Sequence, residues 1–154
     1  MKLTIISGRS GSGKSTVLHI LEDRGYYCID NLPASLLPAL ADRISNGDAH
    51  LSDIAVSIDA RNISADLQQA PEIISELQAR ELSTEIIFLD ANSQTLLKRF
   101  SESRRKHPLS NESTDLREAI DIESALLESI SMMANLVIDT SNMSLHQLRD
   151  LVKN

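Results

Sequence analysis

Residues near the N-terminus have the types and spacing needed to hold a chain of phosphates. Residues 8–15 match the pattern G-x-x-x-x-G-K-[ST] at every fixed position. The two fixed glycines allow backbone conformations closed to other residues, so successive N–H groups can point at phosphate oxygens. The lysine can reach the β- and γ-phosphates, and the final hydroxyl can coordinate Mg²⁺. We predict a phosphate loop formed by Gly8, Arg9, Ser10, Gly11, Ser12, Gly13, Lys14 and Ser15.

The sequence on either side of the phosphate loop is the context that this motif requires. Leu3 to Ser7 is a short apolar run typical of a buried strand, and residues 15–24 repeat apolar side chains at helical spacing. A helix beginning near Lys14 would add the positive end of its dipole to the loop. The alternative is a flexible Gly/Ser loop that only precedes a helix. Because motif and context agree, the segment indicates a purine nucleoside triphosphate site with Lys14 as a catalytic candidate.

Three aspartates that directly follow expected strands are candidates for the site: Asp30, Asp59 and Asp90. Enzymes with such a loop place an aspartate after an apolar strand, where it holds Mg²⁺ directly or through water. We expect Asp59 to share the metal with Ser15, and Asp30 to face the site as a catalytic candidate, since strand carboxyl ends line the ligand crevice. All three aspartates could instead cap helices or form turns.

The segment 98–107 is basic in an otherwise acidic chain, and only Glu102 opposes its charges. Its cationic residues are Lys98, Arg99, Arg104, Arg105, Lys106 and His107. Arg104 and Arg105 are the catalytic candidates here, because arginines near such a loop stabilise charge on a transferring phosphoryl group. The segment could also be a solvated face, or a patch that contacts RNA or protein.

The chain alternates short apolar runs with helical patterns, which predicts an α/β protein. We expect strands at 3–7, 26–29, 54–58, 85–89 and 136–138, and helices at 15–24, 34–44, 72–81, 93–100, 116–134 and 145–153. Residues 101–115 are expected to form a loop or lid, and Ser93 to cap the helix that it begins. Such strands indicate a mainly parallel five-stranded sheet covered on both faces, the three-layer arrangement.

Composition narrows the class of function. The 154 residues carry a net charge of −7, which argues against a nucleic-acid binder that uses its whole surface. The lone Cys28 cannot form an internal disulfide, and no apolar run is long enough for a signal peptide or a membrane span, so we expect a cytoplasmic protein. The sequence contains no D-x-x-G, N-K-x-D or G-x-S-x-G motif, and its four histidines are scattered. These features disfavour a Ras-like GTPase, an acyl transferase and a zinc site.

Several segments together resemble one known family. They are residues 8–15, Leu21 to Pro33, Ser57 to Asn62, Ile87 to Ala91, Arg104 to Leu109 and Leu136 to Ser141. The chain resembles the RapZ/YvcJ family of bacterial nucleotide-binding proteins, in which the RapZ member is an RNase adapter. The match extends from end to end of the chain, and the segments G-Y-Y-C-I-D-N-L-P and R-R-K-H-P-L are its most specific parts.

The resemblance implies a P-loop NTPase fold similar to that of adenylate kinase, with residues 1–154 as one nucleotide-binding domain. It implies ATP at Gly8 to Ser15, and GTP at a second segment formed by Asp59, Ala60, Arg61 and Asn62, with Mg²⁺ and weak ATPase and GTPase activity. Family members continue for about as long again. RNA and the RNase are therefore expected mainly through that C-terminal domain, which is absent from this chain, whereas the oligomeric state of this chain stays open.

Three functions are compatible with these features. The first is a regulatory domain that binds and slowly hydrolyses nucleoside triphosphates. The second is a small-molecule kinase, with Arg104 and Arg105 in a lid and Asp30 as a base or positioner of an unidentified acceptor. The third is a binding module whose conformation depends on nucleotide without hydrolysis. Phosphate release with and without an acceptor distinguishes them.

Overall fold

The fold was analysed in a computed structural model that describes residues 2–9, 12–45, 53–58, 64–79, 83–103, 116–143, 147–148 and 150. The strands are β1 (Lys2–Gly8), β2 (Tyr27–Ile29), β3 (Asp53–Ile58), β4 (Ser83–Asp90) and β5 (Leu136–Asp139). The helices are α1 (Lys14–Asp23), η1 (Ala34–Leu36), α2 (Leu37–Ser45), α3 (Ser64–Gln78), α4 (Ser93–Ser103) and α5 (Leu116–Met133).

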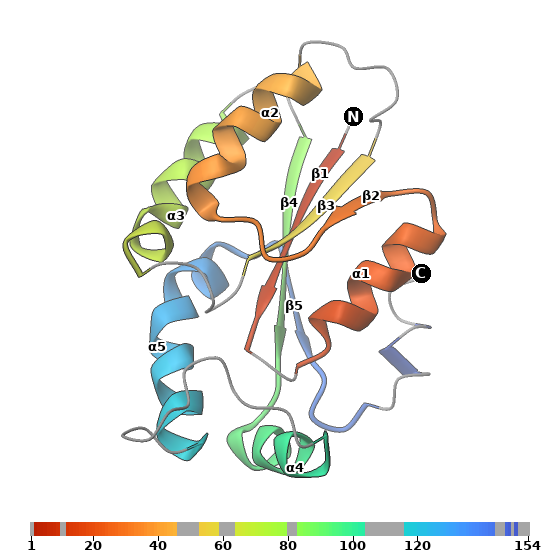
Figure 1. The fold of residues 1–154 in the computed structure, drawn as a ribbon, viewed down its shortest axis with the longest axis vertical. Coiled ribbons are helices and arrows are strands. Elements are labelled where there is room, and N and C mark those ends of the chain that lie inside the picture. Colours follow the sequence, from red (N-terminus) through yellow and green to blue (C-terminus); the bar gives the residue numbers. More distant parts are fainter. Residues whose placement is uncertain are drawn as a thin grey trace.

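The strands form one sheet in the order β2-β3-β1-β4-β5, and every neighbouring pair is parallel. β1 is central, with Ser7 in register with Ile58 of β3 and Phe88 of β4. All strands therefore end at the same edge of the sheet, and α4 lies across that edge (Figure 1). This topology brings the described residues that follow β1, β2, β4 and β5 to the same edge of the sheet.

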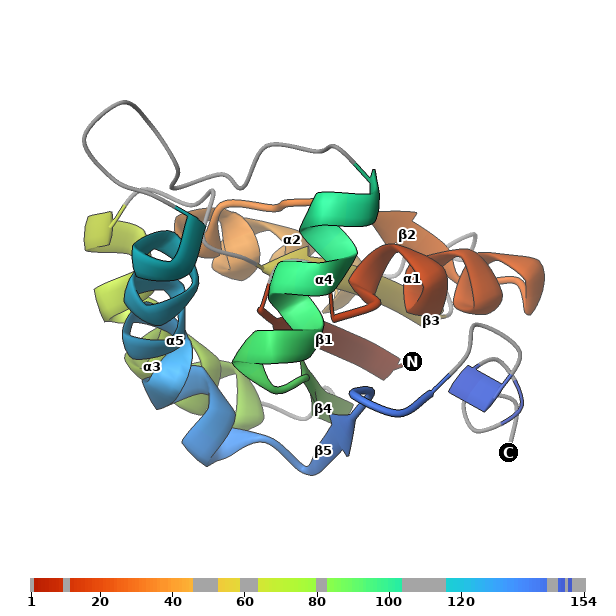
Figure 2. The same cartoon turned by 90° about the horizontal axis from the view of Figure 1, so that it is seen from below.

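Two apolar cores cover the two faces of the sheet. On one face α1 packs through Val17, Leu18 and Leu21 against Ile6 of β1, and Leu148 belongs to the same cluster. On the other face α2, α3 and α5 cover β1, β3 and β4, as both views show (Figures 1 and 2). The structure confirms the predicted three-layer α/β fold with a five-stranded parallel sheet.

Helix α3 begins earlier than the sequence pattern predicts. It starts at Ser64, so Pro71 lies inside the helix and not at its boundary. A proline in a helix interior lacks the N–H that would bond four residues back. Ala70, Ile74 and Leu77 are fully buried in the core. We attribute the continuous helix to the burial of this apolar face, which outweighs the local preference.

The boundaries of two other helices also differ from the prediction. Helix α4 continues through Ser103, so 101–103 are helical and not part of a loop. The expected cap at Ser93 is wrong by one residue, because the side chain of Asn92 accepts the N–H of Thr95 at 2.8 Å. The helix expected from residue 34 begins with a 3₁₀ turn, η1, before α2.

Helix α5 is partly a core helix, as its apolar repeat indicates. Leu127 and Ile130 are fully buried and Met133 packs against the same cluster. Ile122 belongs to the same apolar repeat, which predicts burial, but it is 46% exposed. The side chains of Leu116, Ile120 and Leu126, which continue the repeat, lie outside the described residues. So does the segment 46–48, for which Asn46-Gly47-Asp48 predicts a turn. Among the described helices, none has the length and apolar character that a membrane span needs.

Candidate functional site

The phosphate loop leaves β1 in very close contact with β4. A Cβ placed on Gly8 would lie 2.2 Å from the carbonyl oxygen of Leu89, and the Gly8 φ is 150°. The backbone N–H of Arg9 donates to the same oxygen at 3.3 Å. Only glycine allows the loop to turn here, which explains the first fixed position of the motif.

The lysine of the motif folds back over the loop. Its Nζ donates to the backbone carbonyl of Gly8 at 2.8 Å and to that of Arg9 at 3.1 Å. The Arg9 carbonyl also accepts the backbone N–H of Ser12 at 3.1 Å and the hydroxyl of Ser12. These bonds close the loop into a compact turn and keep the lysine ammonium at its rim.

Helix α1 begins at the loop with an N-terminus that favours an anion. Its N-cap is Gly13, in the left-handed region with a φ of 113°, and glycine has no side chain that could cap the N–H groups of the first turn. The first turn of α1 contains no acidic residue. Ser15 is exposed in that turn, one residue after Lys14. A negatively charged ligand would accept hydrogen bonds from these N–H groups and would be attracted by the positive end of the helix dipole.

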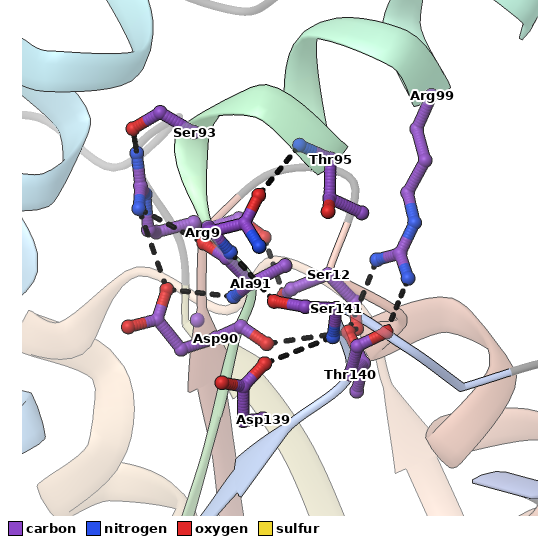
Figure 3. A network of polar contacts seen from close by, with 12 residues as sticks. Arg9, Ser12, Asp90, Ala91, Ser93, Thr95, Arg99, Asp139, Thr140 and Ser141 are labelled. Atoms are coloured by element: carbon purple, nitrogen blue, oxygen red, sulfur yellow. Dashed lines mark hydrogen bonds and ion pairs between the residues drawn. The ribbon is translucent and has the colours of Figure 1, made fainter.

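The side chain of Arg9 leaves the loop toward β4 and α4 (Figure 3). Its Nη1 donates to the carbonyl of Ala91 at 3.0 Å, and its Nη2 donates to the hydroxyl of Ser93 at 3.1 Å. Asp90 lies 3.5 Å from Nη1 as the counter-ion, and its carboxylate also accepts the N–H of Ala91 at 2.8 Å. In this structure the Asp90 carboxylate thus accepts a neighbouring backbone N–H and pairs with an arginine.

A second chain of contacts reaches the loop from β5 and α4 (Figure 3). The Thr140 hydroxyl donates to the backbone carbonyl of Ser12 at 2.7 Å. Arg99 of α4 donates to that hydroxyl at 3.0 Å, and its second nitrogen donates to the Thr140 carbonyl. The N–H of Thr140 in turn donates to the Asp90 carbonyl at 2.8 Å.

The negative charge of Asp139 lies beside this network and is stabilised by local hydrogen bonds. The Asp139 carboxylate, just before Thr140, accepts the N–H of Ser141 at 2.9 Å. Bonds from the side chain and the backbone of Ser141 lower the pKa of Asp139 below its usual value. Asp139 therefore stays ionised at neutral pH.

Asp30 lies at the carboxyl end of β2, at the same edge of the sheet. Its Oδ1 accepts the hydroxyl of Ser57 at 2.6 Å, and the N–H of Asn31 donates to that hydroxyl oxygen at 2.7 Å. Asn31 has a φ of 54°, in the left-handed region that asparagine tolerates. The side chain of Ser7, at the end of β1, donates to the carbonyl of Ile58 at 2.7 Å, which ties the neighbouring strand ends together.

Several predicted site residues lie outside the described part of the chain. They are Ser10, Gly11, Asp59, Ala60, Arg61, Asn62, Arg104 and Arg105. Within the described ranges, the structure brings Gly8, Arg9, Ser12, Gly13, Lys14 and Ser15 together and places Asp30 at the same sheet edge. Of the basic segment, Lys98 is exposed and Arg99 contacts Thr140.

A groove of about 430 Å³ lies between Arg9 and helix α5. Among the described residues of its lining, Asp90, Asp121 and Glu128 are acidic and Arg9 is the cation. The excess of carboxylates among these residues would repel a phosphate, so we do not assign the triphosphate to this groove.

The donors available for a metal are few. No group of three or more His, Cys, Asp or Glu side chains suited to a metal ion occurs among the described residues. The exposed Ser15 hydroxyl is a hard oxygen donor of the kind that Mg²⁺ accepts beside phosphate oxygens. The chemistry of the donor fits Mg²⁺ delivered together with a nucleotide.

Thr140, and the role of Arg99 as its partner, were missed by the sequence interpretation. Thr140 directly follows β5, as the candidate aspartates follow their strands. Because the predicted strand ends at Ile138, the strand-end criterion would have had to include the second polar residue beyond the strand to select it.

The parallel sheet, with a glycine-rich loop between its central strand and α1, defines the class of three-layer P-loop proteins. Solved structures with this architecture include a sugar kinase from Janibacter, with a TM-score of 0.60 and 20% identity over 99% of this chain and 90% of that one. A shikimate kinase from Acinetobacter baumannii has a TM-score of 0.60 and 15% identity over 99% of this chain and 89% of that one. At these identities the likeness concerns the fold.

Within this class the family is also defined. The profile of the RapZ-like N-terminal domain matches residues 1–154, and the chain belongs to that family. A relative named nucleotide-binding protein from Hahella chejuensis is 59% identical over 99% of this chain and 54% of its own length. A protein of the same name from Stutzerimonas stutzeri is 54% identical with the same coverage. The chain thus spans about half the length of these curated relatives.

Proposed function

We propose that this chain is a regulatory domain that binds ATP or GTP with Mg²⁺ at the phosphate loop and hydrolyses it slowly. The observation that carries the proposal is the junction of the loop with α1. There Gly13 leaves the helix N–H groups uncapped, and Lys14 holds its ammonium at the loop rim by bonds to Gly8 and Arg9. The oxygens of a triphosphate would accept hydrogen bonds from these N–H groups and pair with the lysine ammonium at the same time. The printed name of the relatives, nucleotide-binding protein, supports the same ligand class.

The remaining parts of the proposal come from the sequence, for the metal and the arginines, and from the family resemblance, for the second nucleotide segment and the adapter. Asp59 would help Ser15 to hold Mg²⁺, and Asp59 to Asn62 would form the second nucleotide segment. Arg104 and Arg105 would stabilise charge on the phosphoryl group as it is transferred. The domain would act in the cytoplasm as the N-terminal half of a longer adapter, whose RNA and RNase contacts involve mainly the other half.

The test is calorimetry with Mg-ATP and Mg-GTP together with an assay of phosphate release. We expect Lys14→Ala to weaken triphosphate binding by about tenfold or more, which corresponds to about 1.4 kcal/mol, because a cation at the β- and γ-phosphates is removed. Lys98→Ala makes the same change of charge at an exposed position of α4 and serves as the control. Unchanged affinity in Lys14→Ala would count against the phosphate loop as the site. Tight binding without phosphate release would favour the binding module.

A small-molecule kinase is the second candidate, favoured by the Asp30 carboxylate that Ser57 orients at the carboxyl edge of the sheet. A carboxylate held in this way could take the proton of an acceptor hydroxyl. Gluconate and shikimate are suitable probes, because a gluconokinase and shikimate kinases share the fold. If the chain is a kinase for such a polyol, a probe will speed ATP consumption, and Asp30→Asn will remove that acceleration. Without any acceleration by these probes, the hydrolytic function is the better assignment.

A further inference from the structure

Helix α4 holds the phosphate loop from two sides. At its first residue, Ser93 accepts a hydrogen bond from the Arg9 side chain. Further along the helix, Arg99 binds Thr140, whose hydroxyl donates to the carbonyl of Ser12. Figure 3 shows the two sets of contacts on either side of the loop, both reaching α4.

These contacts lie in the protein interior. Arg9 is 7% exposed, Thr140 is 2% exposed and Ser12 is fully buried. Hydrogen bonds to charged groups are stronger where water is excluded. The Nε of Arg9 is buried without a hydrogen-bond partner among the described residues, which is a cost to stability. An arginine that leaves one N–H unsatisfied is better explained by what it positions than by what it adds to stability.

The Thr140 contact acts on the part of the loop that faces the ligand. The carbonyl of Ser12 and the N–H of Gly13 belong to one planar peptide group, and in a trans peptide they point in opposite directions. The structure has no cis peptide among its described residues. When Thr140 holds the Ser12 oxygen on the β5 side, it directs the Gly13 N–H away from β5, at the start of α1.

We propose that Thr140 and Arg99 form a relay that orients the Ser12–Gly13 peptide for phosphate binding, with Arg9 holding the opposite side of the loop. Arg99 donates to the Thr140 hydroxyl oxygen, so the hydroxyl itself is left to act as a donor. The Ser12 carbonyl accepts from it at 2.7 Å and is the nearer of two acceptors, since the Asp90 carbonyl lies at 3.2 Å. These three are positioning residues, since the proposed ligand would contact the loop backbone and not their side chains. The inference rests on the proposed function of the phosphate loop.

The test compares Thr140→Val, which keeps the shape and removes the hydroxyl, with Thr140→Ser, which keeps the hydroxyl. The control is Thr95→Val, which removes a threonine hydroxyl from α4. Thr95 donates to Asn92 through its backbone N–H, which the substitution keeps. The ligands are Mg-ATP and inorganic triphosphate, which has no base or ribose. We expect Thr140→Val to weaken both ligands about five- to tenfold, the size of one hydrogen bond. Thr140→Ser and Thr95→Val should stay within about twofold of the wild type, on the same scale.

A spectroscopic measurement separates positioning from general stability. In ¹⁵N-labelled protein, inorganic triphosphate should shift the Gly13 amide resonance of the wild type. The shift should be smaller in Thr140→Val at saturating ligand and should return in Thr140→Ser. If Thr140→Val does not fold, Arg99→Gln tests the same relay with Thr140 retained, and a smaller Gly13 shift is again expected.

The outcomes separate the relay from the function on which it rests. A wild-type chain that binds neither ligand would overturn the proposed function and the relay together. If the wild type binds both ligands and Thr140→Val binds them equally well, only the relay is wrong. A loss confined to ATP, with inorganic triphosphate unaffected, would also overturn the relay, because it would locate Thr140 at the base or ribose.

Discussion

At the scale of single residues, two glycines with positive φ face different surroundings. Gly8 has a φ of 150°, and an added Cβ would lie 2.2 Å from the carbonyl oxygen of Leu89. Gly25 follows α1 with a φ of 94°, and an added Cβ would meet nothing within 4 Å. The positive φ disfavours a side chain at both positions. At Gly8 a side chain would in addition clash with the β4 backbone. The pair therefore separates the conformational cost of a side chain from the steric cost.

We expect Gly8→Ala to lower the free energy of unfolding by about 2–4 kcal/mol, since β4 backbone must move to admit the methyl group. Gly25→Ala should cost about 1 kcal/mol, because only the backbone preference is violated. Urea denaturation of both variants beside the wild type measures the difference. If both variants lose the same free energy of unfolding, the clash with Leu89 adds no cost and this prediction is wrong.

The residues of the site differ in how far the sequence could predict them. Gly8, Gly13 and Lys14 lie in one contiguous motif, so their types and spacing were enough to bring them together. The Thr140 hydroxyl and the Ser12 carbonyl are 128 positions apart in the chain, and no local pattern relates them. The direction of the Arg9 side chain likewise depends on Ala91 and Ser93, which only the folded sheet places beside it.

At the scale of elements, α3 is a helix in which local preference and core packing disagree. Pro71 removes one backbone donor in its middle, while Ile74 and Leu77 are fully buried. The sequence interpretation treated the proline as a boundary and therefore began the helix too late. Strand positions were predicted more closely, because a continuous apolar run has few other uses in a small α/β domain.

We expect Pro71→Ala to raise the free energy of unfolding by about 1 kcal/mol. The alanine would supply an N–H for the carbonyl four residues back, and part of that gain would be lost to a more flexible unfolded chain. Pro38→Ala is the control, because Pro38 lies in the first turn of α2, where a helix does not need that donor. Thermal and urea unfolding should show stabilisation only in Pro71→Ala. A loss of stability there would mean that the packing of the proline ring matters more than the missing bond.

At the scale of the whole molecule, the class of fold was predictable and the order of the strands was not. Apolar runs at Leu3 to Ser7 and at 54–58, separated by helical patterns, are typical of a parallel sheet covered on both faces. Which strands become neighbours depends on pairings between distant segments, such as Lys2 with Asp53 and with Ser83. Neither the net charge of −7 nor the coverage of about half of the relatives' length predicts the order of the strands.

The central place of β1 has a consequence for how the protein is made. The ribosome synthesises β1 first, yet both of its partners, β3 and β4, are synthesised after α1, β2 and α2. Until residue 90 has left the exit tunnel, β1 cannot pair with β4, so one of its edges is unpaired and its apolar residues are only partly buried. We therefore expect the nascent chain to expose apolar residues of β1 until β3 and β4 have been synthesised. The loop that we propose binds phosphate therefore gains its contact with β4 only when β4 docks against Gly8.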